Sequence, residues 1–439
     1  MKKGILLPIF SLPNKKQNGT FGKEAYEFID ILSNNKIDYW EILPINDYDI
    51  SPYSPISYYA LCDKYLDTKK LEELNLIETQ NKDKDILLEE AYIKFKKNEK
   101  LHNSQEYKDF LIKKEIKDYA EYMHKKNNKD IEYYIFIQYI LDIEWKELKE
   151  YANNKNVQII GDMPIYPDYH SSEVKYNTKY YDLDENNKMK YVSGASPDYF
   201  NREGQKWGHP LYNFNKLKEE KYNYLLKRYQ EYLNRFDLIR IDHFRAYDSF
   251  YKIPFDKTAK EGFYELGPSY DFFDELFKIT NSNKFIVEDL GDLRKETFEL
   301  KKHYNLKGMK IIQYTINPLE KKDEYENSSQ MIIYTGNHDN NTIIGWYNEL
   351  SEKNKENIKE FLEENNCLKA TINESFIKYC LKTAIKYDND SIIVIIPVQD
   401  IIGLDENSRI NKPGQTLAEN WKWQLNNYDK LIEKIAIFN

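Results

Sequence analysis

The chain has 439 residues and a formal net charge of −9, so it can bury a large core but has no basic excess. This charge argues against nucleic acid or an anionic membrane surface as a partner, because both favour a basic face. The three cysteines, Cys62, Cys367 and Cys380, are odd in number and lack metal-type spacing, which predicts a reducing compartment and no zinc site.

The chain begins with MKKGILLPIFSLPNKK, in which two lysines precede an apolar run as they do in an export signal. Pro8 breaks this run and more lysines follow, so the run is shorter than the apolar core of a signal peptide. We interpret residues 4–9 as a first strand. The apolar stretch IIVIIPV at 392–398 is too short to cross a bilayer. We therefore expect a cytoplasmic protein with no membrane partner.

Eight short apolar runs are strand candidates: 4–9, 38–43, 157–162, 237–242, 284–288, 309–314, 331–335 and 391–396. Most are separated by charged stretches of helical periodicity, for example KYNYLLKRYQEYLNRF at 221–236, as in parallel strands joined by crossover helices. An open doubly wound sheet has the same alternation. The strand count, together with the carboxylates that end several strands, favours a closed α/β barrel of the (β/α)8 TIM type. We predict one catalytic domain over residues 1–439.

Two connections are too long to be simple crossovers. Residues 66–135 are charged and helix-forming, which predicts a helical insertion after the second strand. Residues 168–218 contain Gly, Pro, Asn and Tyr with little periodicity, which predicts an irregular subdomain after the third strand. Because long structured loops on a barrel rim usually carry function, both insertions are candidate parts of a site.

The fragment RIDHFRAY at 240–247 places Arg240 and Asp242 two residues apart at the end of a β-branched run. Successive strand side chains alternate, so these two share a face and His243 should point away from Asp242. A guanidinium beside a carboxylate lowers its pKa, as an attacking carboxylate at neutral pH requires. Asp242 is therefore a candidate nucleophile, although an isolated Arg-x-Asp pair is more often an ordinary salt bridge.

Two further strands end in acidic residues. FIVEDLG at 285–291 ends in Glu288 and Asp289, and MIIYTGNHDNNT at 331–342 is followed by His338 and Asp339. One such end is usually a cap or turn, but three in series predict catalytic residues at the carboxyl ends of barrel strands. Three apolar residues precede Glu288, which should raise its pKa so that it starts protonated. Strand pleating alone does not choose between Glu288 and Asp289.

These motifs and others occur in the order found in one family, from the first strand to the last loop: LPIFSLP (7–13), DYWEILPI (38–45), SPYSPIS (51–57), GDMPIY (161–166), PDYFNREGQKWGHPLYNF (197–214), RIDHFRAY, VEDLG, TGNHDNNT and NKPGQTLAENWKW (411–423). Nearly the whole chain resembles the 4-α-glucanotransferases (amylomaltases, or disproportionating enzymes) of the α-amylase clan. GDMPI and GQKWG are the specific segments, because the wider clan shares only the carboxylate motifs.

The resemblance implies a retaining transferase that moves α-1,4-glucan segments from a maltodextrin donor to a glucose or maltodextrin acceptor. Asp242 would be the nucleophile that forms a covalent glycosyl-aspartate, Glu288 the general acid/base, and Asp339 the carboxylate that stabilises the transition state. The first two must lie roughly 5–5.5 Å apart in a retaining enzyme. Carboxylates suffice for this chemistry, so no metal or other cofactor is expected.

The resemblance also implies the residues that bind the glucan: Arg240, His338, Tyr53, Asp162, Trp207, Gln205 and Asn411. Without it, structural roles would be preferred for most of them, such as a turn tyrosine, an exposed amide and a packed aromatic ring. The 39 tyrosines alone are weak evidence for sugar stacking, because the composition is also biased toward Asn, Lys and Ile.

The chain departs from the family pattern at five positions that spare every catalytic carboxylate: Ala246, Asn337, Asn341, Glu419 and Gln424. An α-glucan hydrolase of the same clan is the main alternative, since hydrolases and transferases of the clan share the same carboxylate motifs. A non-catalytic glucan-binding protein is a third reading, against which the three retained carboxylates argue. The sequence does not specify an oligomeric state.

Overall fold

The computed structural model describes residues 1–14, 18–79, 82–197, 202–316, 331–386, 392–415 and 417–438. A parallel sheet at its centre has the strand order β10-β11-β12-β1-β2-β3-β6-β9. These strands are β1 (Lys2–Leu6), β2 (Tyr39–Glu41), β3 (Gln158–Met163), β6 (Leu238–Ile241), β9 (Phe285–Val287), β10 (Gly308–Ile311), β11 (Met331–Tyr334) and β12 (Ile393–Pro397). The two end strands meet where the Val287 N–H donates to the Lys307 carbonyl at 2.8 Å. The predicted α/β barrel is confirmed.

Each predicted strand region overlaps one of these strands, but β1 and β10 end three residues before their apolar runs do. The run 4–9 leaves the sheet after Leu6, because Pro8 leads into a short 3₁₀ helix. The run 309–314 turns at Ile312 into α14 (Ile312–Ile316). Residue 391, the first of the last predicted run, lies outside the described residues. Apolar side chains past a strand end thus remain buried in the barrel mouth instead of lengthening the strand.

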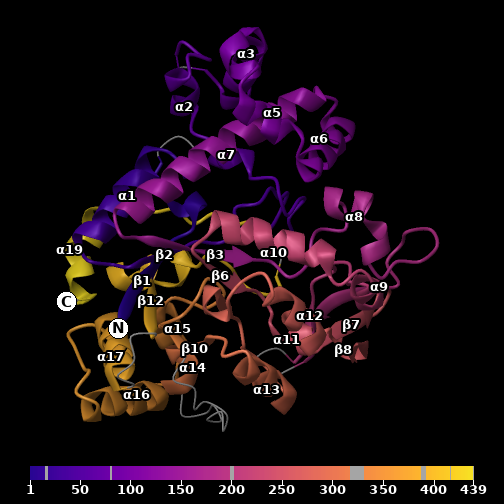
Figure 1. Cartoon of the computed structure of the whole chain (residues 1–439). Helices are drawn as coiled ribbons and strands as arrows, with labels where there is room; N and C mark the ends of the chain where they lie inside the picture. Colours follow the sequence, from indigo (N-terminus) through magenta and orange to yellow (C-terminus); the bar gives the residue numbers. More distant parts are fainter. Residues whose placement is uncertain are drawn as a thin grey trace.

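Amphipathic helices cover the outside of the barrel, among them α1 (Lys23–Asn34), α7 (Ile131–Asn154) and α10 (Asn223–Arg235) (Figure 1). On α10 the buried residues recur at helical spacing, from Tyr224 and Leu225 through Arg228 and Tyr229 to Tyr232. The strands are therefore buried on both faces, which explains why they are continuous apolar runs in the sequence. The two chain termini lie on the same side of the molecule, since β1 pairs with β12 (Figure 1).

The segment 66–135 is largely helical, as predicted. Its helices stand together above α7 in Figure 1. They are α2 (Thr68–Glu73), α3 (Lys84–Lys97), α4 (Glu99–His102), α5 (Gln105–Leu111) and α6 (Lys114–Asn127). Phe95 packs against Tyr107 and against Phe136 of α7, with ring centroids 4.8 and 4.7 Å apart, so the insertion shares a core with the crossover helix.

The segment 168–218 contains α8 (Ser172–Tyr176), β4 (Tyr191–Ala195), β5 (Gln205–Lys206) and α9 (Phe214–Glu219). Its two strands join β7 (Ser249–Pro254) and β8 (Phe263–Leu266) in an antiparallel sheet of order β5-β4-β7-β8. The sequence did not reveal this sheet because β4 pairs with β7, which follows β6 far along the chain. Figure 1 places β7 and β8 at one side of the barrel, beyond α10 and α12 (Ser269–Leu276).

No helix within the described part of the chain is both long and apolar enough to cross a membrane. The cytoplasmic location and the single-domain organisation stay predictions.

Candidate active site

Arg240, at the end of β6, joins three carboxylates in the barrel mouth. Its Nη1 donates to both carboxylate oxygens of Asp162 at 2.7 Å and to Asp242 Oδ1 at 3.3 Å. Its Nη2 lies 3.0 Å from Glu288 Oε2, and the arginine side chain is 1% exposed. The acids follow or end β3, β6 and β9, which are neighbours in the sheet. Two of the three strand-end acids singled out from the sequence, Asp242 and Glu288, thus lie with Asp162 around one buried guanidinium, whereas Asp339 does not contact it in the described structure.

Asp242 and Glu288 are hydrogen-bonded to each other and also receive different main-chain donors. The Ile165 N–H donates to Asp242 Oδ2 at 3.3 Å, and the His243 N–H donates to Glu288 Oε2 at 2.8 Å. The shorter contact and the direct Arg240 Nη2 pair both favour negative charge on Glu288. Burial and the neighbouring Glu288 charge raise the pKa of Asp242 well above its ordinary value.

The order of ionisation is the reverse of the sequence prediction. Although burial would raise it, Arg240 and the His243 N–H lower the pKa of Glu288 to about 2. The prediction paired Arg240 with Asp242, but Arg240 Nη1 is shared between Asp242 and Asp162 while Nη2 serves Glu288. The two carboxyls form a coupled pair, in which the Arg240 contact and the His243 N–H favour negative charge on Glu288 over Asp242.

Asp289 faces away from this group. Its carboxylate pairs with Lys301 and accepts from the Met309 N–H at 2.7 Å, and its side chain is 6% exposed. Of the two acidic neighbours that strand pleating left open, Glu288 is therefore the one that joins Arg240 and Asp242.

Tyr53 and His338 form the next layer of the site. The Tyr53 hydroxyl donates to Asp162 Oδ2 at 2.5 Å and lies 3.4 Å from His338 Nδ1. The two rings stack with centroids 4.9 Å apart and planes at 16°, and the Trp421 ring lies 5.5 Å from Tyr53. Burial lowers the pKa of His338, so its imidazole is neutral at physiological pH. Trp421 was not singled out from the sequence, because no acidic motif surrounds it.

Asp339 follows β11 and is tied to the last loop of the chain. Asn411 Nδ2 donates to Asp339 Oδ1 at 2.7 Å, and Arg409 Nη2 donates to the Asp339 carbonyl at 2.8 Å. His338 Nε2 lies 3.5 Å from Asp339 Oδ2. The Asp339 side chain is 36% exposed, against 17% for Asp242, so it is the more open of the two. The sequence reasoning missed Arg409, which no motif marked.

Gln205 and Trp207 reach the site from the segment between β4 and α9. Trp207 Nε1 donates to Gln205 Oε1 at 3.1 Å, and the Trp207 ring lies edge-on to the His243 ring, with centroids 4.7 Å apart. Since the His243 N–H binds Glu288, a chain of contacts runs through all the predicted site residues, ordered as Asn411, Asp339, His338, Tyr53, Asp162, Arg240, Asp242, Glu288, His243, Trp207 and Gln205.

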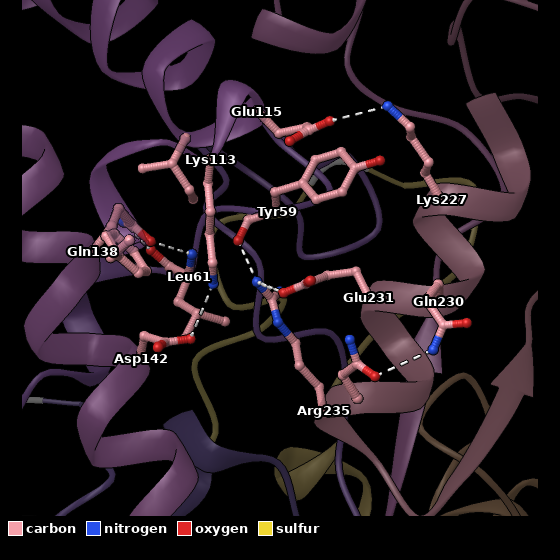
Figure 2. A pocket seen from close by; sticks show the side chains of 13 residues that line it. Tyr59, Leu61, Lys113, Glu115, Gln138, Asp142, Lys227, Gln230, Glu231 and Arg235 are labelled. Atoms are coloured by element: carbon pink, nitrogen blue, oxygen red, sulfur yellow. Dashed lines mark hydrogen bonds and ion pairs between the residues drawn. The ribbon is translucent and has the colours of Figure 1, made fainter. Parts of the chain in front are cut away.

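A cavity of about 340 Å³ lies apart from these carboxylates, between the helical insertion and α10 (Figure 2). Its charged side chains face one another: Arg235 Nη2 lies 2.9 Å from Glu231, and two lysines lie 3.9 Å from acids, Lys113 from Asp142 and Lys227 from Glu115. The cavity is thus an ionic crevice between two packed elements. None of the carboxylates around Arg240 lines it, so the candidate site is the barrel mouth.

One group of possible metal ligands occurs among the described residues. Oxygen and sulfur atoms of Asp47, Cys62 and Asp63 lie within 4.8 Å of one another. Burial raises the pKa of Asp47 to about 7, and its carboxyl accepts from the Tyr119 hydroxyl at 2.7 Å. A largely protonated carboxyl beside a buried thiol is a poor cation ligand. The expectation of a metal-free enzyme stays a prediction.

A closed parallel barrel with acids at its strand ends, two of them in hydrogen-bonding contact, is the arrangement of a barrel enzyme that acts on glycosidic bonds. The sequence profile described as 4-alpha-glucanotransferase matches residues 7–129 and 91–430. The chain belongs to the 4-alpha-glucanotransferase family. The predicted family and enzyme class are confirmed.

Individual relatives match along almost the whole chain. The 4-alpha-glucanotransferase of Clostridium butyricum is 33% identical over 477 aligned positions, which cover 95% of this chain and 94% of that protein. The enzyme of the same name from Aquifex aeolicus is 29% identical and covers 96% and 95%. Amylomaltase from Streptococcus agalactiae, solved in complex with acarbose, superposes with a TM-score of 0.90 at 28% identity and covers 100% and 97%.

Proposed function

We propose that this 4-α-glucanotransferase transfers α-1,4-glucan segments between maltodextrins by a retaining double displacement. The observation that carries the proposal is the direct contact between the Asp242 and Glu288 carboxyls, both held by Arg240. Two carboxyls so close can attack and protonate one glycosidic bond in turn. An inverting enzyme would need roughly 6.5–9.5 Å between them, to admit a water molecule.

In the first step an Asp242 oxygen attacks the anomeric carbon while the bond from that carbon to the leaving oxygen breaks. Glu288 donates its proton to the leaving oxygen, and a glycosyl ester of Asp242 remains. This requires the single proton of the pair to lie on Glu288. Because the empty site favours charge on Glu288, donor binding must raise the pKa of Glu288 relative to that of Asp242.

In the second step Glu288, now ionised, accepts the proton of an acceptor hydroxyl. The acceptor oxygen attacks the anomeric carbon, the ester bond breaks, and Asp242 leaves as a carboxylate. Asp339 stabilises the positive charge of both transition states, and its open position toward solvent supports contact with the sugar. Arg409 and Asn411 fix its main chain and its carboxylate.

The other predicted residues divide by their exposure. Asp162 and Arg240 are both 1% exposed and the His338 side chain is 2% exposed, so these three serve the glucan through the residues that they hold. Tyr53 and Trp207 are partly exposed and are candidates for direct contact, with Gln205 orienting the Trp207 ring. Acarbose, a ligand of the Streptococcus agalactiae amylomaltase, supports a glucan-like ligand for this cleft.

The products from maltotriose test the proposal. A transferase releases glucose and forms longer maltodextrins, whereas a hydrolase of the same clan gives only shorter sugars. The intermediate is tested separately: a slowly hydrolysed fluoro-sugar donor should leave one glycosyl group on the peptide that contains Asp242, detected by mass spectrometry. Absence of labelled peptide under conditions that inactivate the enzyme would remove the glycosyl-aspartate from the mechanism.

A further inference from the structure

We propose that His243 is a positioning residue that acts through its left-handed backbone, which allows its N–H to meet Glu288 while the chain turns, and not through its ring. This inference rests on the proposed acid/base role of Glu288. It concerns the main chain of a residue that strand alternation had only placed away from Asp242.

The backbone of His243 is unusual at the point where it meets Glu288. Its φ is +46°, a conformation that non-glycine residues rarely adopt and that tends to persist at functional sites. The His243 N–H donates to Glu288 Oε2 at 2.8 Å. The flanking main chain is tied to the same residue: the Glu288 N–H donates to Ile241 O at 3.0 Å, and the Phe244 N–H donates to Glu288 O at 3.1 Å. The positive φ lets the chain turn between these two flanking contacts while the His243 N–H points to Glu288 Oε2, so another φ would break one of the three hydrogen bonds.

The ring of His243 packs against Trp207 of the segment between β4 and α9. It meets the Trp207 ring edge-to-face, with planes at 90° and centroids 4.7 Å apart, while Trp207 Nε1 binds Gln205. Burial lowers the pKa of His243 to about 4, so the ring carries no charge at neutral pH. His243 therefore acts on Glu288 at that pH through its amide dipole. The GQKWG segment reaches the acid/base through this contact.

Four other titratable groups bear on Glu288: Arg240 at 3.0 Å, Asp242 by a direct hydrogen bond, His338 from the loop after β11, and Asp162 through Arg240. Since the amide stabilises ionised Glu288, turning it away raises the pKa of that carboxyl. The second protonation of the Asp242 and Glu288 pair, which inactivates the enzyme, then occurs at higher pH. The acid limb of the plot of kcat/KM against pH should therefore move to higher pH.

The test compares substitutions by their tolerance of a positive φ. Gly and Asn accept this conformation, whereas β-branched Val and Thr strongly disfavour it, and Asn and Thr are close in size. We expect His243→Gly and His243→Asn to keep kcat/KM on maltotriose within about tenfold of the parent with an unmoved acid limb. His243→Val and His243→Thr should lose about a hundredfold or more and show an acid limb displaced to higher pH. Melting temperature is measured for each variant.

Lys36 provides the matched control, because it also has a positive φ of +56° but precedes β2, at the opposite end of the barrel. Lys36→Gly and Lys36→Val should change melting temperature without changing the acid limb. If either β-branched variant at 243 fails to fold, His243→Ala takes its place. Equal losses in the Gly, Asn, Val and Thr variants would assign the effect to the ring and overturn the proposal.

The failure of the inference can be told apart from failure of the proposed function. Glu288→Gln is assayed in parallel on maltotriose and on a donor with an activated leaving group. If Glu288→Gln still transfers from maltotriose, Glu288 is not the acid/base and the proposed function fails. Suppose that Glu288→Gln loses that activity as expected. If the Gly and Asn variants at position 243 then behave like the Val and Thr variants, the inference alone is wrong.

Discussion

At the scale of the residue, the site depends on which carboxyl carries the proton. Arg240 touches Asp162, Asp242 and Glu288 with one guanidinium, and of the last two only Glu288 also accepts from the His243 N–H. Residue types and strand spacing located this group but assigned the pKa values in the wrong order. The cause is geometric: the distances from one guanidinium to several oxygens depend on side-chain conformations that spacing does not encode.

Asp242→Asn should abolish transfer while the protein stays folded. The amide keeps nearly the shape of the carboxyl but cannot form the glycosyl ester, so activity should fall by at least about 10⁴-fold. The melting temperature should not fall, because burial and the Glu288 charge disfavour the ionised form of Asp242 and the amide is neutral. Both are measured on one preparation, and activity within tenfold of the parent would exclude Asp242 as the nucleophile.

Glu288→Gln and Asp289→Asn should have opposite effects on chemistry and stability. The first should lose activity on maltodextrins and keep part of it on a donor with an activated leaving group, which needs little protonation. The second breaks the buried pair with Lys301 and should cost roughly 3–5 kcal/mol of unfolding free energy, with kcat of the folded enzyme unchanged. Kinetics with both donors and chemical denaturation check the contrast. Equal loss of Glu288→Gln on both donors would contradict the assignment.

At the scale of the element, apolar runs predicted where strands begin better than where they end. The eight-strand count was visible because each strand is buried on both faces. The antiparallel sheet was not, because β4 finds β7 only after about fifty residues of intervening chain. Trp421 and Arg409 were missed because they meet Tyr53 and Asp339 across the barrel mouth, a proximity that sequence order does not reveal even though Trp421 lies within a family motif.

The buried Glu41 of β2 should make the unfolding free energy of the protein depend on pH. It is buried inside the barrel, where it accepts from the Tyr334 hydroxyl at 2.8 Å, and burial raises its pKa from 4.5 to about 7. The folded state thus binds a proton that the unfolded state releases between pH 4.5 and 7, so this contribution to stability is lost as pH rises through that window. The parent should lose about 2–3 kcal/mol of unfolding free energy over this pH range, and the Glu41→Gln variant should not.

Denaturant unfolding at several pH values measures this difference. The slope of unfolding free energy against pH, between pH 4.5 and 7, should be flatter for Glu41→Gln than for the parent. Glu185→Gln, at an exposed loop position, is the control and should follow the parent. Parallel curves for Glu41→Gln and the parent would show that Glu41 ionises freely in the folded protein.

At the scale of the whole molecule, insertions from distant parts of the chain converge on one barrel mouth. The segment between β4 and α9 reaches His243 through Trp207, and the last loop reaches Asp339 through Arg409. The helical insertion instead packs over α7 and leaves an ionic crevice against α10 (Figure 2). Two separate loops therefore control access to the carboxylates.

Trp207→Ala should raise the share of product formed by attack of water. Removing the ring opens the rim beside the acid/base and takes away a sugar-facing surface. Because Trp207 is only half-buried, the loss of unfolding free energy should stay below the roughly 3–5 kcal/mol of a core tryptophan. Phe255→Ala, at a 55% exposed ring of the same antiparallel sheet, is the control. Glucose, maltodextrins and melting temperature are followed together, and an unchanged transfer-to-hydrolysis ratio would make Trp207 a packing residue.

The raised pKa of Asp242 has a consequence for the enzyme without substrate. A protonated carboxyl is a weak nucleophile, so a raised pKa lowers the reactivity of Asp242 toward stray electrophiles. We expect a bound donor to favour the ionised form of Asp242, because the proposed mechanism needs its carboxylate. A carboxyl-directed alkylating reagent should therefore modify Asp242 faster in the presence of a short, slowly cleaved oligosaccharide that fills only the neighbouring subsites than in its absence.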